Sequence, residues 1–495
     1  MNTFDRSNSQ SDPRSDATDC EGKYPIPESA GASLLPSTTS CATLETIASD
    51  AGLTLQPDEY SLLTDLYQLT MAACYTGKGL EQRPASFEVT VRRLPPGFGY
   101  LVAMGLAQVL DYLENLHFTS AQVEALKATG IFANVPDAFW SLLTSARFSG
   151  DGWAVPEGTI VFANEPLLRI EAPLWQAQLV ETYILNALNY QTLVATRSAR
   201  LRDVAGPTAT LLEFGTRRAF SPQASLWAAR AALAAGLDAT SNVLAALKLG
   251  RKPAGTMAHA LVMALTATEG SEREAFAAFH ETFPGAPLLI DTFDSIAAAE
   301  SLAEQVRAGT MKLGGVRLDS GDLVNLSQQV RALLPGVPIL ASGDLDEYKI
   351  AELRAAGACI DGYGLGTKLV TGQPVNGVYK LVELDGIPVM KESSGKVTYP
   401  GRKQIFRQYE NGVVQRDRLG LATEPAHEET PLLKQFFQNG KRIHSAESLE
   451  TIALRTATSV ASLPPEIRSL EGQTSFPVTL SPELQTLIQQ TRNTH

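Results

Sequence analysis

The chain of 495 residues is long enough for two or three domains with separate hydrophobic cores. Its hydrophobic content of 44% and charged content of 19% are typical of a soluble globular protein. The formal net charge of −12 argues against nucleic acid as a main partner, because phosphate backbones are bound by basic surfaces. We also expect no membrane span, since no apolar run approaches the roughly 18 residues that one requires.

The N-terminal region, residues 1–57, is rich in Ser, Thr, Asp, Pro and Ala and has no signal-peptide core. Its scattered acidic residues are atypical of transit peptides. We therefore expect a disordered extension and a cytoplasmic protein. The cysteines agree with a reduced compartment, because they lie far apart without a Cys-x-x-Cys pair, at Cys20, Cys41, Cys74 and Cys359.

Residues 58–205 are expected to form an α+β domain. Apolar residues at helical spacing in 58–79 predict a helix that ends near Gly77 and Gly79. Runs of valine, isoleucine and leucine broken by Pro and Gly turns predict strands farther along. The further elements are a strand at 85–94, helices near 100–116 and 120–129, strands within 153–172 and a long helix at about 173–203.

Residues 206–372 repeat one pattern, a short apolar strand followed by a polar or Gly-rich turn and an amphipathic helix. This α/β alternation predicts a parallel sheet with right-handed crossovers. About seven units with very short strands favour an irregular TIM-like α/β barrel over a doubly wound sheet. The expected strands are 209–214, 237–240, 253–257, 287–291, 315–319, 337–342 and 358–364, with helices at 294–308, 322–334 and 346–356.

Residues 373–495 return to short β-like segments, such as 378–384 and 387–393, and end in helical sequence. We expect this region to pack back on residues 58–205. Segments from both the N- and C-terminal parts would then form a second α+β domain beside the barrel.

Polar residues follow the expected strands at their carboxyl ends, where barrels of this class place their substrate-binding loops. Two of these turns, Ser-Gly-Asp at 342–344 and Gly-Leu-Gly-Thr at 364–367, have small residues whose backbone N–H groups can converge on an anion. Glycines also serve tight turns, but two such turns at adjacent strand ends favour a phosphate site.

Carboxylates lie at two neighbouring strand ends, with Asp291 and Asp294 after one strand and Asp319 and Asp322 after the next. Such oxygen ligands could hold Mg²⁺ through water beside a bound phosphate, and Asp319 and Asp322 are the ligands we favour. The alternative for Asp294 and Asp322 is that each only caps the helix that follows.

Arg317 occupies the middle of a strand, in the sequence Gly-Val-Arg-Leu-Asp-Ser-Gly-Asp. An arginine directed into a barrel mouth needs an anionic partner, because an unpaired buried charge is costly. Its planar fork suits a carboxylate or a phosphate. His259, after the strand at 253–257, is either functional or a structural hydrogen-bonding residue, and Tyr67 taken alone is consistent with a core aromatic.

Together these motifs resemble the nicotinate phosphoribosyltransferase family. The matching segments lie in order and cover most of the chain after its N-terminal extension. They are 63-LTDLYQLTM-71, 86-SFEVTVRRLP-95, 213-EFGTRRAFSP-222, 240-TSNVLA-245, 255-GTMAH-259, 316-VRLDSGDL-323, 341-ASGDLDE-347 and 362-GYGLGTKLVT-371.

The resemblance implies an irregular α/β barrel with a second domain from both chain ends, in a head-to-tail homodimer with shared active sites. It implies an ATP-coupled reaction of NAD salvage, in which nicotinate and phosphoribosyl pyrophosphate give nicotinate mononucleotide and pyrophosphate. ATP is then a co-substrate. We expect Mg²⁺ as a cofactor, because it stabilises a departing pyrophosphate.

Roles follow for the positions that match the family. Tyr67 would stack on the pyridine ring from the partner subunit, Thr256 would touch nicotinate, and Arg317 would pair with the nicotinate carboxylate. His259 would be the residue that ATP phosphorylates.

A second group of matching positions would hold phosphoribosyl pyrophosphate. Gly343, Gly366 and Thr367 would bind its 5′-phosphate. Arg217 and Asp319 would lie near the ribose and the pyrophosphate, where a carboxylate favours an oxocarbenium-like sugar.

Three alternatives stay open. A transferase of the same fold could use nicotinamide or quinolinate, although Arg317 favours an acid over an amide and a second carboxylate calls for a more cationic pocket. A non-catalytic nucleotide-binding relative is opposed by the joint presence of His259, Arg317 and Asp319. An aldolase-type barrel would need a Schiff-base lysine within a strand, whereas Lys368 follows one.

Overall fold

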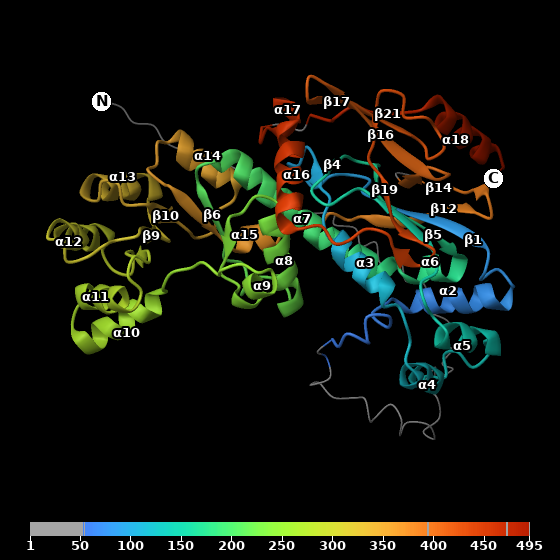
Figure 1. The fold of residues 1–495 in the computed structure, drawn as a ribbon, viewed down its shortest axis with the longest axis horizontal. Coiled ribbons are helices and arrows are strands. Elements are labelled where there is room, and N and C mark those ends of the chain that lie inside the picture. Colours follow the sequence, from blue (N-terminus) through green and yellow to red (C-terminus); the bar gives the residue numbers. More distant parts are fainter. Residues whose placement is uncertain (1–52, 54, 394–395, 472–473, 495) are drawn as a thin grey trace, which may run out of the picture.

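The computed structural model describes residue 53 and residues 55–393, 396–471 and 474–494. Most of the expected N-terminal extension, 1–57, therefore lies outside the described residues. The described chain forms two bodies side by side, a barrel and a larger mixed domain (Figure 1). Among the described residues, no helix combines the length and apolar character needed to cross a membrane.

Six parallel strands form the barrel, in the spatial order β7-β6-β11-β10-β9-β8. β11 pairs with β6, so the last strand of the series lies beside the first and the expectation of an irregular α/β barrel is confirmed. The strands are β6 (Thr210–Glu213), β7 (Ala239–Thr240), β8 (Leu288–Leu289), β9 (Val316–Leu318), β10 (Ile339–Ala341) and β11 (Gly362–Leu365).

The barrel's irregularity lies between β7 and β8, where the sequence predicts a strand at 253–257. That prediction is wrong, because this segment has no strand conformation. Its backbone contact with the sheet is a hydrogen bond of 2.9 Å from the Ala254 N–H to the Thr240 carbonyl. Pro253 has no N–H to donate and Gly255 weakens an extended segment, which explains the missing ladder.

Helices cover the outside of the barrel, and those expected at 294–308, 322–334 and 346–356 are present. Each of these three begins after an aspartate whose side chain accepts backbone N–H groups of the first turn. The barrel helices are α8 (Pro222–Ala234), α9 (Val243–Lys248), α10 (His259–Glu269), α11 (Glu272–Thr282), α12 (Ser295–Arg307), α13 (Leu323–Leu333), α14 (Glu347–Ala355) and α15 (Thr367–Val370).

The second domain combines strands from both parts of the chain, as expected. Its seven-stranded sheet has the order β13-β12-β1-β5-β3-β19-β20, and β1 pairs antiparallel with both β5 and β12. The N-terminal strands are β1 (Pro84–Thr90), β3 (Asp151–Ala154) and β5 (Pro166–Pro173). The C-terminal strands are β12 (Val378–Leu384), β13 (Ile387–Pro388), β19 (Lys434–Gln438) and β20 (Lys441–Arg442).

Smaller sheets and helices complete this domain. A four-stranded sheet has the order β18-β16-β17-β21, and β2 pairs with β4 and β14 with β15. These strands are β2 (Leu101–Val102), β4 (Ile160–Val161), β14 (Lys391–Ser393), β15 (Lys396–Thr398), β16 (Lys403–Glu410), β17 (Val413–Leu421), β18 (Thr430–Pro431) and β21 (Val478–Leu480). The helices are α2 (Leu66–Gly77), α3 (Leu106–Glu114), α4 (Ser120–Ala128), α5 (Asp137–Thr144), α6 (Leu174–Leu179), α16 (Leu449–Ala461), α17 (Pro465–Arg468) and α18 (Pro482–Thr494).

The long helix α7 (Glu181–Ala205) joins the two bodies. It contacts α3 and β2 of the second domain and α8, α14 and α15 of the barrel. The single helix expected at 173–203 is therefore two helices, α6 and α7, which meet at Val180.

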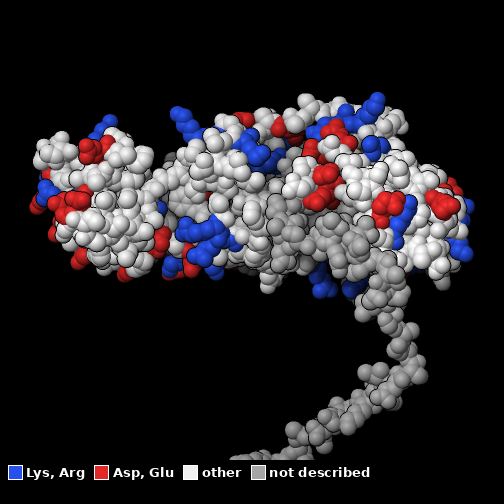
Figure 2. Space-filling view, turned by 90° about the horizontal axis from the view of Figure 1, so that it is seen from below, with Lys and Arg blue, Asp and Glu red and all other residues white. Residues whose placement is uncertain are grey.

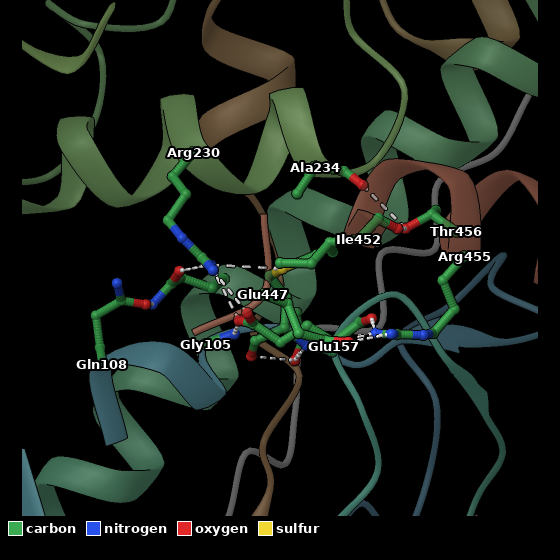
Figure 3. Close-up of polar contacts among 12 residues, drawn as sticks. Gly105, Gln108, Glu157, Arg230, Ala234, Glu447, Ile452, Arg455 and Thr456 are labelled. Atoms are coloured by element: carbon green, nitrogen blue, oxygen red, sulfur yellow. Dashed lines mark hydrogen bonds and ion pairs between the residues drawn. The ribbon is translucent and has the colours of Figure 1, made fainter. Parts of the chain in front are cut away.

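A buried ion pair also crosses the junction (Figure 3). Arg230 of α8 points toward the Glu157 carboxylate and donates to it at 2.9 and 2.6 Å, and the Gly105 N–H donates to the same carboxylate at 2.7 Å. Arg455 approaches from the other side and donates to the Glu157 carbonyl at 2.7 Å. The Glu157 segment thus connects the barrel with helices from both ends of the second domain.

Candidate functional site

The carboxyl ends of the barrel strands bring Arg317 and Thr256 together. Arg317 lies in β9, and its Nη1 donates to the Thr256 hydroxyl at 2.7 Å. Arg317 Nε is buried and has no hydrogen-bond partner within the described part of the chain. A guanidinium held by a neutral hydroxyl keeps donors for an anionic ligand.

The charge around Arg317 is unbalanced. Burial lowers its pKa, Asp319 and Asp291 oppose this effect, and nearby Arg217 lowers the pKa further. Arg217 is exposed on the loop after β6 and lies close enough to affect the pKa of Arg317, so the two arginines predicted at the site are near each other. A bound anion would be stabilised by both side chains.

The carboxylates at this end are held in fixed orientations. Asp291 Oδ2 accepts from the Asp319 N–H at 2.8 Å and from the Ser320 hydroxyl at 2.9 Å, and the Ser342 hydroxyl donates to Asp319 Oδ1. Asp291 Oδ1 is buried without a hydrogen-bond partner among the described residues. Asp322 instead caps α13, where it accepts the Asn325 N–H at 3.2 Å.

The described residues contain no group of three or more His, Cys, Asp or Glu side chains placed to hold a metal ion. Mg²⁺, however, commonly keeps several waters and binds one or two carboxylates together with substrate phosphates. Asp319 and the unpaired oxygen of Asp291 fit that donor set. The cap contact of Asp322 agrees with the structural alternative for that residue.

His259 is the first residue of α10 and lies at the same end of the barrel. Its Nδ1 is 3.1 Å from the Thr292 hydroxyl, and Thr292 follows Asp291 in sequence. This contact fixes the ring beside the loop that carries the unpaired carboxylate oxygen.

The two glycine turns follow the neighbouring strands β10 and β11. Gly343 has φ of 92°, and a Cβ there would overlap the Asp319 carbonyl oxygen. Gly366 precedes α15, of which Thr367 is the first residue. Sterics alone account for Gly343, and phosphate binding by these residues stays a prediction.

Tyr67 lies on α2 of the second domain. The residue is 47% exposed, and its hydroxyl donates to Glu181 at 3.3 Å. It lines a cavity of about 390 Å³ together with Tyr190 and Phe220. Arg317 does not line this cavity, and stacking of Tyr67 in the site of a partner subunit stays a prediction.

Sequence reasoning missed Glu213, the last residue of β6. Its buried carboxylate accepts from the Gly215 N–H and the Thr240 hydroxyl, and burial raises its pKa against these contacts. Glu213 thereby fixes the loop that carries Arg217. Its position as an acidic residue at the end of an apolar strand could have identified it from the sequence.

The fold and the barrel mouth define an α/β-barrel protein that gathers Arg317, Thr256 and oriented carboxylates at the carboxyl ends of its strands. Three sequence models of one family match the chain in order. The nicotinate phosphoribosyltransferase N-terminal domain matches residues 62–189, the nicotinate phosphoribosyltransferase family model matches 209–339, and the nicotinate phosphoribosyltransferase C-terminal domain matches 422–488. The chain belongs to the nicotinate phosphoribosyltransferase family.

Individual relatives agree with this assignment. A nicotinate phosphoribosyltransferase of Mycobacterium tuberculosis is 42% identical over 433 residues, which are 85% of this chain and 91% of the relative. A nicotinate phosphoribosyltransferase of Bacillus subtilis is 42% identical over 71% of this chain and 73% of its own. The crystal structure of human nicotinic acid phosphoribosyltransferase superposes with a TM-score of 0.76 at 30% identity, over 86% of this chain and 99% of that one.

Proposed function

We propose that this protein is an ATP-dependent nicotinate phosphoribosyltransferase, which forms nicotinate mononucleotide and pyrophosphate in NAD salvage. The observation that carries the proposal is the Arg317 guanidinium, held by Thr256 and left with a buried, unpaired Nε. A carboxylate can accept two hydrogen bonds from this fork, whereas the amide of nicotinamide carries no charge. The names of the relatives support the same substrate.

The remaining residues of the mouth handle phosphoribosyl pyrophosphate. Gly343, Gly366 and Thr367 receive the 5′-phosphate, and Arg217 faces the pyrophosphate. The pyridine nitrogen carries its own lone pair, so the transfer needs no general base and depends on positioning and charge.

The carboxylate of Asp319, oriented by the Ser342 hydroxyl, favours positive charge on the ribose as pyrophosphate departs. Bound Mg²⁺, held by Asp319 and Asp291, would neutralise the leaving pyrophosphate. The carboxylates thus serve the sugar side of the site and Arg317 serves the acid side.

The proposed enzyme acts as a homodimer in which Tyr67 stacks on the pyridine ring in the site of the partner subunit. Large apolar side chains support such a contact, because Phe220 is 78%, Leu244 53% and Leu247 66% exposed in the single chain. Broad uncharged areas also lie between the charged side chains on the face seen from below (Figure 2). Sedimentation analysis should give a dimer, and Leu247→Asp should shift it toward monomer.

ATP acts in this proposal by phosphorylating His259, which tightens the site for phosphoribosyl pyrophosphate. The contact of His259 with the loop of Asp291 and Thr292 places the ring beside the acidic side of the site. His259→Asn should therefore abolish ATP stimulation of the forward rate, and stimulation that survives the substitution would contradict this role.

The activity itself is tested by product formation from nicotinate and phosphoribosyl pyrophosphate with Mg²⁺, measured with and without ATP. Turnover that ATP stimulates is the expected result. Turnover of quinolinate instead would move the proposal to that substrate. Binding of phosphoribosyl pyrophosphate without turnover of any pyridine would favour a non-catalytic relative.

A further inference from the structure

Helix α7 directs two arginines one turn apart, Arg197 and Arg200, at the two glycine turns of the barrel mouth. The first contact is with the turn after β11. The Arg197 guanidinium donates to the carbonyl oxygens of Lys368 and Thr371. Tyr190, also on α7, donates to the carbonyl oxygen of Val370 at 3.1 Å.

These contacts matter because α15 has only four residues. So short a helix cannot satisfy its last carbonyl groups internally and has little stability of its own. Gly372, at φ of 131°, lies directly against Arg197, since a Cβ there would overlap the guanidinium. The turn that contains Gly366 and Thr367 is therefore held in place from α7.

The second contact is with the turn after β10. Arg200 is 1% exposed, and its Nε donates to Glu347 Oε1 at 2.9 Å. Glu347 is buried and begins α14, immediately after the loop that contains Gly343. A buried ion pair thus fixes the end of this second loop to the same helix.

The two contacts form one cluster. Burial lowers the pKa of Arg197, Glu347 and Asp346 oppose this, and Arg200 lowers the pKa further, so these three charges all act on Arg197. Asp346 caps α14 and lies 3.9 Å from the Lys368 ammonium of the opposite loop. The two loops are therefore connected to each other by this ion pair and to α7 by Arg197 and Arg200.

We infer that Arg197 and Arg200 are positioning residues, which hold the loops at 342–346 and 364–367 at the separation needed to bind the 5′-phosphate of phosphoribosyl pyrophosphate. The inference rests on the proposed function. Arg197 acts through main-chain carbonyl groups and Arg200 acts through Glu347, so neither needs to touch the substrate.

The test compares Arg197→Met with Arg202→Met. Arg202 lies on the same helix and makes contacts of the same kind, donating to the Gly236 carbonyl at 2.7 Å and pairing with Asp238 at 2.7 Å. Its contacts, however, hold the turn that precedes β7 and the segment between α7 and β6, and not the glycine turns. A loss of general stability should therefore be similar in the two variants.

We expect the substitution of Arg197 to weaken binding of phosphoribosyl pyrophosphate but not of nicotinate. Arg197→Met should raise the KM and the Kd for phosphoribosyl pyrophosphate by about tenfold, with the KM for nicotinate within about twofold of the wild type. Arg197→Lys should recover part of the loss. Glu347→Gln should raise the same constants by a smaller factor, and Arg202→Met should lower the Tm and leave both KM values unchanged.

Equal effects of Arg197→Met and Arg202→Met on the Kd for phosphoribosyl pyrophosphate, measured by calorimetry, would overturn the inference. So would an equal rise in both KM values for Arg197→Met. Because calorimetry needs no turnover, wild-type protein that binds phosphoribosyl pyrophosphate but forms no product would count against the proposed function alone.

Discussion

Two arginines of the barrel, Arg230 at the domain junction and Arg317 at the mouth, are both partly removed from water but are matched differently. Arg230 donates twice to the Glu157 carboxylate. Burial lowers the pKa of Arg230, but the ion pair outweighs burial and raises it. Arg317 donates to the neutral hydroxyl of Thr256, and burial leaves its pKa lowered.

This comparison distinguishes an arginine that stabilises the fold, Arg230, from one that is available to bind an anionic ligand, Arg317. Arg407 and Asp417 in the second domain resemble the junction, since their side chains are 2% and 0% exposed and form a two-pronged ion pair. A partly buried cation whose chain supplies no carboxylate contact costs free energy in the free protein. That cost is recovered when an anion binds.

The largest expected effect is on the kinetics of an Arg317→Met variant. Its kcat/KM for nicotinate should fall by about 10³-fold, because a buried charged hydrogen-bond pair with the substrate is lost. Its Tm should stay at or above the wild-type value, because the substitution removes an unmatched charge. A large fall in Tm would show that Arg317 stabilises the fold, as Arg230 and Arg407 do. Arg317→Lys keeps the charge without the fork, so its kcat/KM for nicotinate should lie between those of the wild type and Arg317→Met.

Arg230→Met should instead lower stability and leave substrate binding unchanged. The free energy of unfolding should fall by about 3 kcal/mol, because Glu157 is left buried without its partner. The KM values of the folded variant should stay near those of the wild type. Arg251→Met, which breaks the exposed pair with Glu450, is the control and should leave the midpoint of urea unfolding near the wild-type value.

The ion pair between Arg230 and Glu157 should also make the stability of the fold depend on pH. Burial raises the pKa of Glu157, but Arg230 outweighs burial and lowers the pKa below 4.5. The ion pair therefore stabilises the fold above about pH 4.5 and is lost as pH falls through the lowered value. The stability difference between the wild type and Glu157→Gln should shrink on acidification, and a constant difference would contradict the pairing.

The smallest expected effect concerns Glu272, near the barrel mouth. Burial, followed by Asp294 and Asp291, raises its pKa to about 7. A carboxyl group with a raised pKa makes the fold less stable as pH rises from 4.5 to about 7, since the folded state holds its proton longer. Glu272→Gln should flatten the pH dependence of the Tm over this window. The slope should be modest, because the side chain is partly exposed.

The sequence alone predicted the barrel and the chemistry of one strand end. The short apolar strands alternate with helices at regular spacing, so β6 to β11 were expected. A further strand was expected at 253–257 but is absent, because Pro253 removes a donor. The position of Arg317 in the middle of an apolar strand similarly predicted that this residue binds an anion.

What the sequence did not predict depends on contacts between distant residues. Arg230 meets Glu157 across 73 positions, and Arg197 meets Lys368 across 171. Arg230 and Arg197 are ordinary surface-compatible residues on helices, and no local pattern shows which distant group each contacts. Such pairs become visible only when the packing of α7 and α8 is known.

The central claim is that Arg317 selects a carboxylate substrate. The most direct measurement is the ratio of kcat/KM for nicotinate to that for nicotinamide, in the wild type and in Arg317→Met. We predict a wild-type ratio on the order of 10⁴ that falls toward 1 in the variant. A wild-type enzyme that uses both substrates equally, or a variant that keeps the ratio, would contradict the account.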